Sequence, residues 1–351
     1  MRVAIATVQV PFIRGGAETL VESLRDELVA RGHEAEVVTL PFRWSPPEAL
    51  VDCMTMGRML DLTESAGAKI DVVIAVKFPA YYLRHPRKVV WLCHQHRQAY
   101  DLWDTPYGDL HRLPQGDSVR RLIVNSDNQA FAEAQRVYTI SANVSARLLR
   151  YNGIASTPLY HPPLHHERLH AEEYGDFVFY PSRIDAMKRQ HLLVEAARHL
   201  QTNTRIVLAG GAGGPEAARL EELVRRHRLE HRVAMLGHVT EEAKLDLYAR
   251  CLAVYFGAYD EDYGYVTLEA LASAKPVLIH PDAGGPAEFV TDGRDGFVVP
   301  AEPEAIAASI DRLARDRSLA RAMGEAGRRG LAAKGLGWDA VVSALTDWAR
   351  G

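Results

Sequence analysis

Residues 260–290 read DEDYGYVTLEALASAKPVLIHPDAGGPAEFV, and this stretch says more about function than any other part of the chain. A helix is predicted to open at Gly264, with Glu261 in the loop before it and Glu269 about one turn into it. A helix N-terminus presents N–H groups without helical partners and a partial positive charge, which suit an anionic diphosphate. Carboxylates on either side can accept hydrogen bonds from the hydroxyls of a sugar and of a ribose. Together with the following Gly284-Gly285 and Glu288, the stretch favours a nucleotide-sugar site.

Length and composition restrict the class of protein. The 351 residues are enough for two domains of ordinary size, and 47% of them are apolar, which allows a substantial core. The net charge of −4 argues against a nucleic-acid binder, whose domains tend to be basic. Three widely spaced cysteines without a CxxC pair predict buried thiols in a reducing cytosol rather than disulfides or a zinc site.

No targeting or membrane segment is expected. The N-terminal MRVAIATVQVP has a short apolar run interrupted by Thr7 and Gln9, which predicts a buried strand rather than a signal peptide. No run approaches the roughly 18 apolar residues of a transmembrane helix.

Short apolar runs alternate with amphipathic helices in both halves of the chain, the pattern of parallel α/β sheets. A first helix is expected at 16–31 and a last one at 337–351, and the proline- and histidine-rich segment 157–176 is the candidate linker. Strands are predicted at 3–8, 36–40, 72–76, 89–93, 122–125, 137–140, 177–180, 205–209, 233–236, 253–256, 276–280 and 296–299. Two doubly wound domains facing each other would bind ligands in a central cleft, at the carboxyl ends of their strands.

Two further segments carry candidate phosphate ligands. Gly15-Gly16 opens the first helix, where a backbone without side chains can approach a phosphate or a sugar; a plain glycine turn is the alternative. Arg183 and Lys188 follow the first strand of the second half, where two cations can neutralise a diphosphate. The adjacent Arg189 competes for that role, and a solvated basic loop is the alternative.

The glycine-rich segment LAGGAGGPE at 208–216 follows a strand, but such a turn alone is a weak dinucleotide signal. The first strand lacks GxGxxG, and the second ends in Thr39-Leu40-Pro41 without an acidic ribose ligand. These features argue against a nicotinamide enzyme.

The segment VVWLCHQHRQAYDLWDTPYGDL at 89–110 places His94 directly after a strand, where it can hydrogen-bond a sugar or a departing phosphate. A structural histidine is the alternative. His94 and His96 resemble a metal pair, but no third ligand stands at a characteristic spacing, so no metal is expected.

Taken together, these stretches resemble retaining glycosyltransferases of family 4, which have the GT-B fold. The resemblance runs from RGGAETLVESLRDELVARGHEAEVV through SRIDAMKRQ and VLAGGAGGPE to DEDYGYVTLEALASAKPVL and GGPAEFVTDGRDGFVV. It implies two Rossmann-like domains: residues 1–165 on the acceptor side, with the helix at 337–351 packing back on them, and residues 172–336 for the nucleotide-sugar.

The resemblance also implies roles for individual residues. The catalytic candidates are His94, Arg183, Lys188 and Glu261. Donor or nucleotide ligands are expected at Gly15, Gly16, Arg183, Lys188, Gly210, Gly211, His238, Val239, Tyr263, Gly264, Tyr265, Val266 and Glu269. In this scheme Glu269 binds the ribose and Glu261 the donor sugar. The acceptor-side candidates are His96, Arg97, Tyr100 and Asp101.

The chain departs from the family pattern near the first glutamate. It has Phe256-Gly257-Ala258-Tyr259 where the family often has Pro-Ser, and Asp262-Tyr263-Gly264 in place of Gly-Phe-Gly. These changes bear on the identity of the donor sugar. The triplet 260–262 also resembles the metal-binding acidic motif of the other common glycosyltransferase architecture, but it lies late in the chain and inside a better-matched motif.

The expected activity is transfer of a hexosyl group, with retention, from a UDP- or GDP-type donor to a saccharide or lipid-linked acceptor, without a metal or other cofactor. A bacterial polysaccharide, glycolipid or glycoconjugate pathway is expected. Rival hypotheses are an epimerase or phosphorylase on the same fold, a non-catalytic nucleotide-sugar-binding subunit and a dinucleotide oxidoreductase. A cytoplasmic protein is expected. Residues 81–88 are expected to form either an ordinary solvated loop or an aromatic and basic patch that makes a peripheral contact with the inner membrane face. The patch comprises Tyr81, Tyr82, Leu83, Arg84, Arg87 and Lys88.

Overall fold

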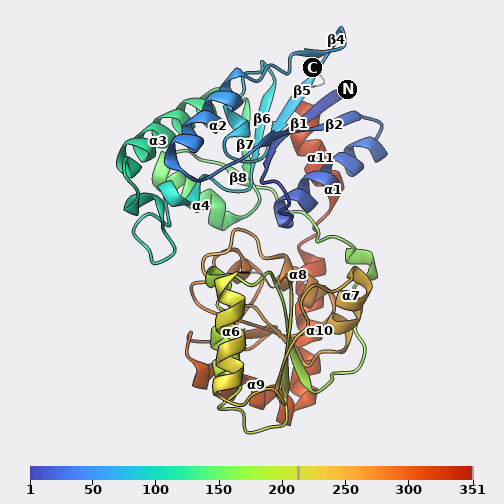
Figure 1. The fold of residues 1–351 in the computed structure, drawn as a ribbon. Coiled ribbons are helices and arrows are strands. Elements are labelled where there is room, and N and C mark those ends of the chain that lie inside the picture. The colour runs from blue at the N-terminus through green and yellow to red at the C-terminus, as the bar shows by residue number, and fades with distance from the viewer. Residues whose placement is uncertain (212–213, 350–351) are drawn as a thin grey trace. The chain divides into compact units, whose positions relative to one another are not determined.

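The computed structural model describes residues 1–211 and 214–349, and it divides into two compact units. The first unit contains residues 1–164 and the segment from Gly337 onward, and the second contains residues 165–336. Each unit is built on a six-stranded sheet flanked by helices (Figure 1). The predicted α/β fold with two parallel sheets is confirmed.

The first unit pairs its strands in the order β2-β1-β5-β6-β7-β8, all parallel. A two-stranded hairpin, β3–β4, stands apart from this sheet and was not predicted. The elements are β1 Arg2–Gln9, α1 Gly16–Ala30, β2 Glu34–Pro41, α2 Pro47–Met59, β3 Glu64–Ser65, β4 Ala68–Lys69, β5 Val72–Ala75, β6 Lys88–Leu92, α3 Gly116–Ala132, β7 Arg136–Thr139, α4 Ala142–Asn152, β8 Thr157–Pro158 and α11 Trp338–Thr346.

The second unit pairs its strands in the order β11-β10-β9-β12-β13-β14, again all parallel. Numbered within the unit, this order is 3-2-1-4-5-6, the doubly wound arrangement of dinucleotide-binding domains. The elements are β9 Phe177–Pro181, α5 Gln190–Ala196, β10 Arg205–Ala209, α6 Pro215–Arg226, β11 Val233–Met235, α7 Glu241–Arg250, β12 Ala253–Tyr255, α8 Tyr265–Ala272, β13 Val277–Ile279, β14 Gly296–Val298, α9 Pro303–Arg315 and α10 Arg317–Ala333.

Burial explains why these short runs form strands. All residues of β5, β6, β12 and β13 are buried, as expected for strands of a parallel sheet that helices cover on both faces. Around the second sheet α8 packs against α10, and α5 packs against α6 and α9. The strand order reverses between β9 and β12, so their carboxyl ends form the switch point where such sheets bind ligands.

The strand predicted at 122–125 is wrong, because these residues lie inside α3. The apolar run Leu122-Ile123-Val124 suggested a strand, but the buried positions follow helical spacing through Val119, Ile123 and Asp127. Leu122 is exposed on the other side of the helix.

The segment predicted as a linker at 157–176 begins within the first sheet, because Thr157 pairs with Tyr138 of β7. At the C-terminus α11 buries Val341, Val342 and Leu345, and a single 3-10 turn follows at Asp347–Ala349. The last two residues of the helix predicted at 337–351 lie outside the described residues.

Candidate functional site

The loops that follow β9 and β12 meet at the switch point of the second sheet. Lys188 ends a short 3-10 helix, Ala186–Lys188, in the first loop, and Glu261 lies in the second. The Nζ atom of Lys188 is 2.5 Å from Oε2 of Glu261, and both side chains are about three-quarters buried. Because neighbouring parallel strands end at the same edge, the topology brings together two residues that lie 73 positions apart.

The neighbouring Arg189 has a different role. Its side chain is buried and donates hydrogen bonds to the carbonyl oxygens of Gly257 (2.6 Å) and Ala258 (3.3 Å). It also forms an ion pair at 2.7 Å with Asp282, which lies in the second half of the 260–290 stretch. Arg189 therefore braces the loop after β12, whereas Lys188 extends toward Glu261. Arg183 is exposed and forms no ion pair with the described residues.

The loop carrying Glu261 is held by the Gly284-Gly285 turn. The amide of Glu261 donates to the carbonyl of Ala283, and the amide of Gly285 donates back to the carbonyl of Glu261, both at 2.8 Å. A Cβ at Gly285 would lie 2.7 Å from the carbonyl oxygen of Asp262, so only glycine permits this approach. The glycine pair thus fixes the position of the first glutamate.

Helix α8 begins directly after this loop, as predicted. Gly264 has φ +86°, and a Cβ there would lie 2.6 Å from Pro286. The ring of Tyr263 packs edge-on against Tyr265 and Phe289, so Tyr263 is buried while Tyr265 and Val266 are half-buried in the first turn. The α8 N-terminus follows the loop that carries Glu261, and the N–H groups of a helix N-terminus suit an anionic group.

Glu269 is 7% exposed in the second turn of α8. Its Oε1 is 3.3 Å from Nζ of Lys244, and its Oε2 accepts a 2.7 Å hydrogen bond from the hydroxyl of Tyr248. Burial raises the pKa of Glu269, and both partners oppose that rise. Sequence reasoning missed Lys244 and Tyr248; their i, i+4 spacing on α7 was the available signal.

A third loop at the same edge contains the predicted glycines. A Cβ at Gly210 would lie 2.0 Å from the carbonyl oxygen of Ser182, so this glycine lets the loop pack against the one carrying Arg183. The amide of Gly210 donates to the carbonyl of Gly237, next to the exposed His238 and the half-buried Val239. Gly211 is exposed, and the glycine-rich motif continues at 212–213, outside the described residues.

In the first unit, Gly15 and Gly16 form the start of α1 as predicted, but the amide of Gly15 already donates to the carboxylate of Glu18 at 2.8 Å. A phosphate at this helix start would have to compete with that side chain. His94 follows β6 and is half-buried, with Nδ1 2.6 Å from the carbonyl oxygen of Gln95.

The predicted acceptor-side residues lie mostly in the interior of the first unit. His96 is buried against Phe42 and Phe78, and burial lowers its pKa to about 3. Tyr100 is buried and donates to Asp127 at 2.7 Å. Arg97 lies 2.6 Å from Asp101, which is also 3.4 Å from Arg147. These contacts hold the residues in place within the first unit, and an acceptor role for them stays a prediction.

The aromatic and basic patch predicted at 81–88 is wrong. Tyr81, Tyr82, Leu83 and Lys88 are buried, and the Lys88 ammonium donates to the carbonyls of Tyr81 and Leu83 inside the unit. Among the residues that the structure describes, no helix has both the length and the apolarity to cross a membrane. The same residues contain no group of three histidine, cysteine or acidic side chains arranged to hold a metal ion.

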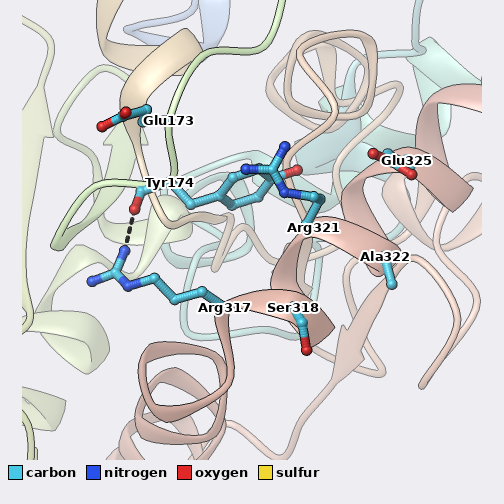
Figure 2. Close-up of a pocket in the computed structure, with 7 residues that line it drawn as sticks. All are labelled: Glu173, Tyr174, Arg317, Ser318, Arg321, Ala322 and Glu325. Carbon is cyan, nitrogen blue, oxygen red and sulfur yellow. Dashed lines mark hydrogen bonds between the residues drawn. The ribbon is translucent and has the colours of Figure 1, made fainter.

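A separate pocket of about 530 Å³ lies at the amino ends of β9 and β13, opposite the edge just described (Figure 2). Arg317 donates to the carbonyl oxygens of Tyr174 and Gly175. The buried Lys275 lies 3.8 Å from the centre of the Tyr174 ring. The Arg317 contacts fasten α10 to the segment that leads into β9, and the Lys275 contact fastens the residues before β13 to the same segment.

The chain is similar to known proteins both in sequence and in fold. Residues 163–330 match the family model described as Glycosyl transferases group 1. A D-inositol 3-phosphate glycosyltransferase of Streptomyces avermitilis is 30% identical over 179 residues, which are 48% of this chain and 38% of that protein. This chain thus spans less than half the length of that relative.

The similarity to solved structures extends over nearly the whole of this chain. A sucrose-phosphate synthase from Thermosynechococcus elongatus has a TM-score of 0.78 at 18% identity, covering 99% of this chain and 98% of its own. Anabaena Alr3699/HepE, solved in complex with UDP and glucose, has a TM-score of 0.71 at 19% identity, covering 100% of this chain and 99% of its own. The chain therefore has the GT-B fold, and its residues 163–330 belong to the glycosyl transferases group 1 family.

Proposed function

We propose that this protein is a retaining glycosyltransferase that moves a hexosyl group from a nucleoside diphosphate sugar to an acceptor hydroxyl. The observation that carries the proposal is the pairing of Lys188 with Glu261 at the switch point of the second sheet, beside the start of α8. A cation, a helix N-terminus and a carboxylate here supply ligands for a diphosphate and for sugar hydroxyls. The family match over residues 163–330 supports the same assignment.

In this proposal Lys188 and the exposed Arg183 stabilise the charge that develops on the diphosphate as the donor bond breaks. Glu261 accepts hydrogen bonds from the donor sugar, and the N–H groups of the first turn of α8 bind the phosphate. Glu269 accepts from the ribose, and the loops at Gly210 and His238 flank the nucleoside. From the first unit, Gly16 and His94 keep the phosphate and sugar roles that the family resemblance implies.

The proposed chemistry is a front-face substitution. The bond from the anomeric carbon to the leaving phosphate oxygen breaks, and a bond to the acceptor oxygen forms on the same face. The acceptor proton passes to the departing phosphate. The cations and the helix N-terminus stabilise the leaving group, so we propose that transfer needs no metal ion.

Structures of Alr3699/HepE bound to UDP and to UDP-glucose support a UDP-type donor, with a GDP type as the alternative. The bacterial relatives, whose names describe glycosyltransferases, support a role in the synthesis of a bacterial polysaccharide, glycolipid or glycoconjugate. We propose the first unit as the acceptor-side domain and the second as the nucleotide-sugar domain.

The test is to incubate the protein with UDP-glucose or a GDP-hexose, with and without a panel of saccharide and lipid-linked acceptors. Nucleoside diphosphate released only when an acceptor is present, together with a glycosylated product, is expected. An epimerase would interconvert the donor without releasing nucleotide, and a phosphorylase would require inorganic phosphate. Binding of donors without turnover for any acceptor would favour a non-catalytic subunit.

A further inference from the structure

Two side chains of α7 hold the buried carboxylate of Glu269. Lys244 and Tyr248 are four residues apart and so lie on one face of the helix. Lys244 is 3.3 Å from Oε1 of Glu269, and Tyr248 donates to Oε2 at 2.7 Å. Each carboxylate oxygen therefore has one donor from α7.

These donors favour the ionised form of the Glu269 carboxyl group. Burial disfavours an ionised carboxylate, whereas hydrogen bonds from an ammonium and a phenol stabilise it. Burial also lowers the pKa of Lys244, but the neighbouring Glu269 and Glu241 outweigh this effect and raise it, so the ammonium stays charged. Glu241 holds the other side of Lys244 at 2.9 Å.

The same geometry leaves Glu269 with acceptor capacity on both oxygens. An ionised carboxylate has about four lone-pair sites, and one on each oxygen is used by α7. The two oxygens of one carboxylate can each accept a hydrogen bond from one of two adjacent hydroxyl groups. A neutral carboxyl group would lose part of this capacity, since its own proton occupies one oxygen.

We infer that Lys244 and Tyr248 are positioning residues that hold Glu269 ionised and oriented to accept both hydroxyls of a ribose, so that the site selects ribonucleotides over 2′-deoxyribonucleotides. The inference rests on the proposed function, because it takes the ribose of the donor as the ligand of Glu269. Neither residue takes part in bond breaking. Tyr248 is fully buried and acts only through Glu269.

The test is calorimetric titration of the full-length protein with UDP, GDP and ADP and with the 2′-deoxy form of each. Wild-type protein is expected to bind the best ribonucleotide about tenfold or more tightly than its 2′-deoxy form, the difference made by one hydrogen bond to a charged group. The variants Lys244→Met and Tyr248→Phe are each expected to reduce this ratio at least threefold, with little change in affinity for the 2′-deoxy form. Lys244→Arg is expected to restore most of the ratio.

Controls separate this inference from its alternatives. Tyr248→Phe removes only a hydroxyl, so it keeps the test valid if Lys244→Met fails to fold. Glu242→Gln changes the same turn of α7 at a side chain that is 73% exposed and pairs with Arg168, so it leaves Lys244 and Tyr248 in place, and its ratio is expected to match wild type. An equal loss of affinity for both forms in Lys244→Met would mean that Lys244 contacts the phosphates and would overturn the inference.

The remaining outcomes are also decisive. An unchanged ratio in both variants, or an equally low ratio in Glu242→Gln, would overturn the inference while leaving the proposed function standing. A wild-type protein that binds nucleotide without discriminating against the 2′-deoxy form would do the same. Failure of wild-type protein to bind any of the three nucleotides would contradict the proposed function itself.

Discussion

Two adjacent cations, Lys188 and Arg189, differ in their surroundings although nothing in the pattern of residues separates them. Arg189 is buried and donates to backbone carbonyls of the loop after β12, whereas Lys188 reaches Glu261. Their position in the sequence, in the loop after a strand, predicted that both residues lie near the site. Only the fold, which turns one side chain inward, assigns them different roles.

Substitution of the two cations is expected to affect different properties, the rate of transfer for Lys188 and the stability of the fold for Arg189. Lys188→Ala should reduce transfer by roughly 10²–10³-fold with little effect on stability, because it removes a charge that stabilises the leaving group. Arg189→Ala should lower the free energy of unfolding by about 2 kcal/mol, because buried carbonyl oxygens lose their donors. Turnover assays and urea unfolding followed by circular dichroism measure the two effects. Wild-type turnover in Lys188→Ala would defeat its assignment.

The free energy of unfolding is expected to depend on pH through Asp127. This residue accepts hydrogen bonds from Tyr81, Tyr82 and Tyr100 in the first unit. Burial raises the pKa of Asp127 from its ordinary 3.8 to about 7, against the effect of the three hydroxyls. Between these values the folded protein retains a proton that the unfolded chain has released, so rising pH lowers the free energy of unfolding.

Asp127→Asn removes this titration. The stability of the variant relative to wild type is therefore expected to increase between about pH 4 and 7 and then to level off. All five tryptophans belong to the first unit, so thermal melts followed by tryptophan fluorescence report on the relevant part of the chain. A stability difference that stays constant across this range would show that Asp127 is ionised in the folded protein.

At the scale of elements, the sequence predicted most of the second sheet correctly. Short apolar runs bounded by glycine or charged residues predicted β10 at its observed limits and the other strands to within a residue or two. The strand error at 122–125 arose because an apolar triplet on an amphipathic helix resembles a buried strand. The prediction of a surface patch at 81–88 was wrong for a related reason, since composition alone does not show which side chains face inward.

The glycine-rich loop after β10 offers a sharp test of close packing. A Cβ at Gly210 would lie 2.0 Å from the carbonyl oxygen of Ser182, whereas no atom of the described residues lies within 4 Å of one at Gly211. Gly210→Ala should therefore lower the free energy of unfolding by about 2 kcal/mol or more, and Gly211→Ala should change it by less than about 0.5 kcal/mol. Urea unfolding of the two variants measures the difference. Equal stabilities would mean that the loop does not pack as described.

At the scale of the whole molecule, the similarity in sequence to known proteins covers a shorter part of the chain than the similarity in fold. The family model matches residues 163–330, whereas the fold match to sucrose-phosphate synthase covers 99% of the chain. The proposed diphosphate site requires particular residues at particular positions, such as Lys188 and Gly264, so its sequence pattern is recognisable. The first sheet requires only apolar strands of suitable length, and many sequences satisfy that condition.

The central claim is that the second unit binds a nucleoside diphosphate through Lys188 at the switch point of its sheet. Calorimetric titration of wild-type protein and Lys188→Ala with UDP, GDP and ADP tests it directly, with Lys69→Ala, an exposed residue of β4, as the control. At least one nucleotide is predicted to bind wild-type and control proteins equally and Lys188→Ala about tenfold or more weakly. Absence of binding to wild-type protein, or equal binding to all three proteins, would contradict the account.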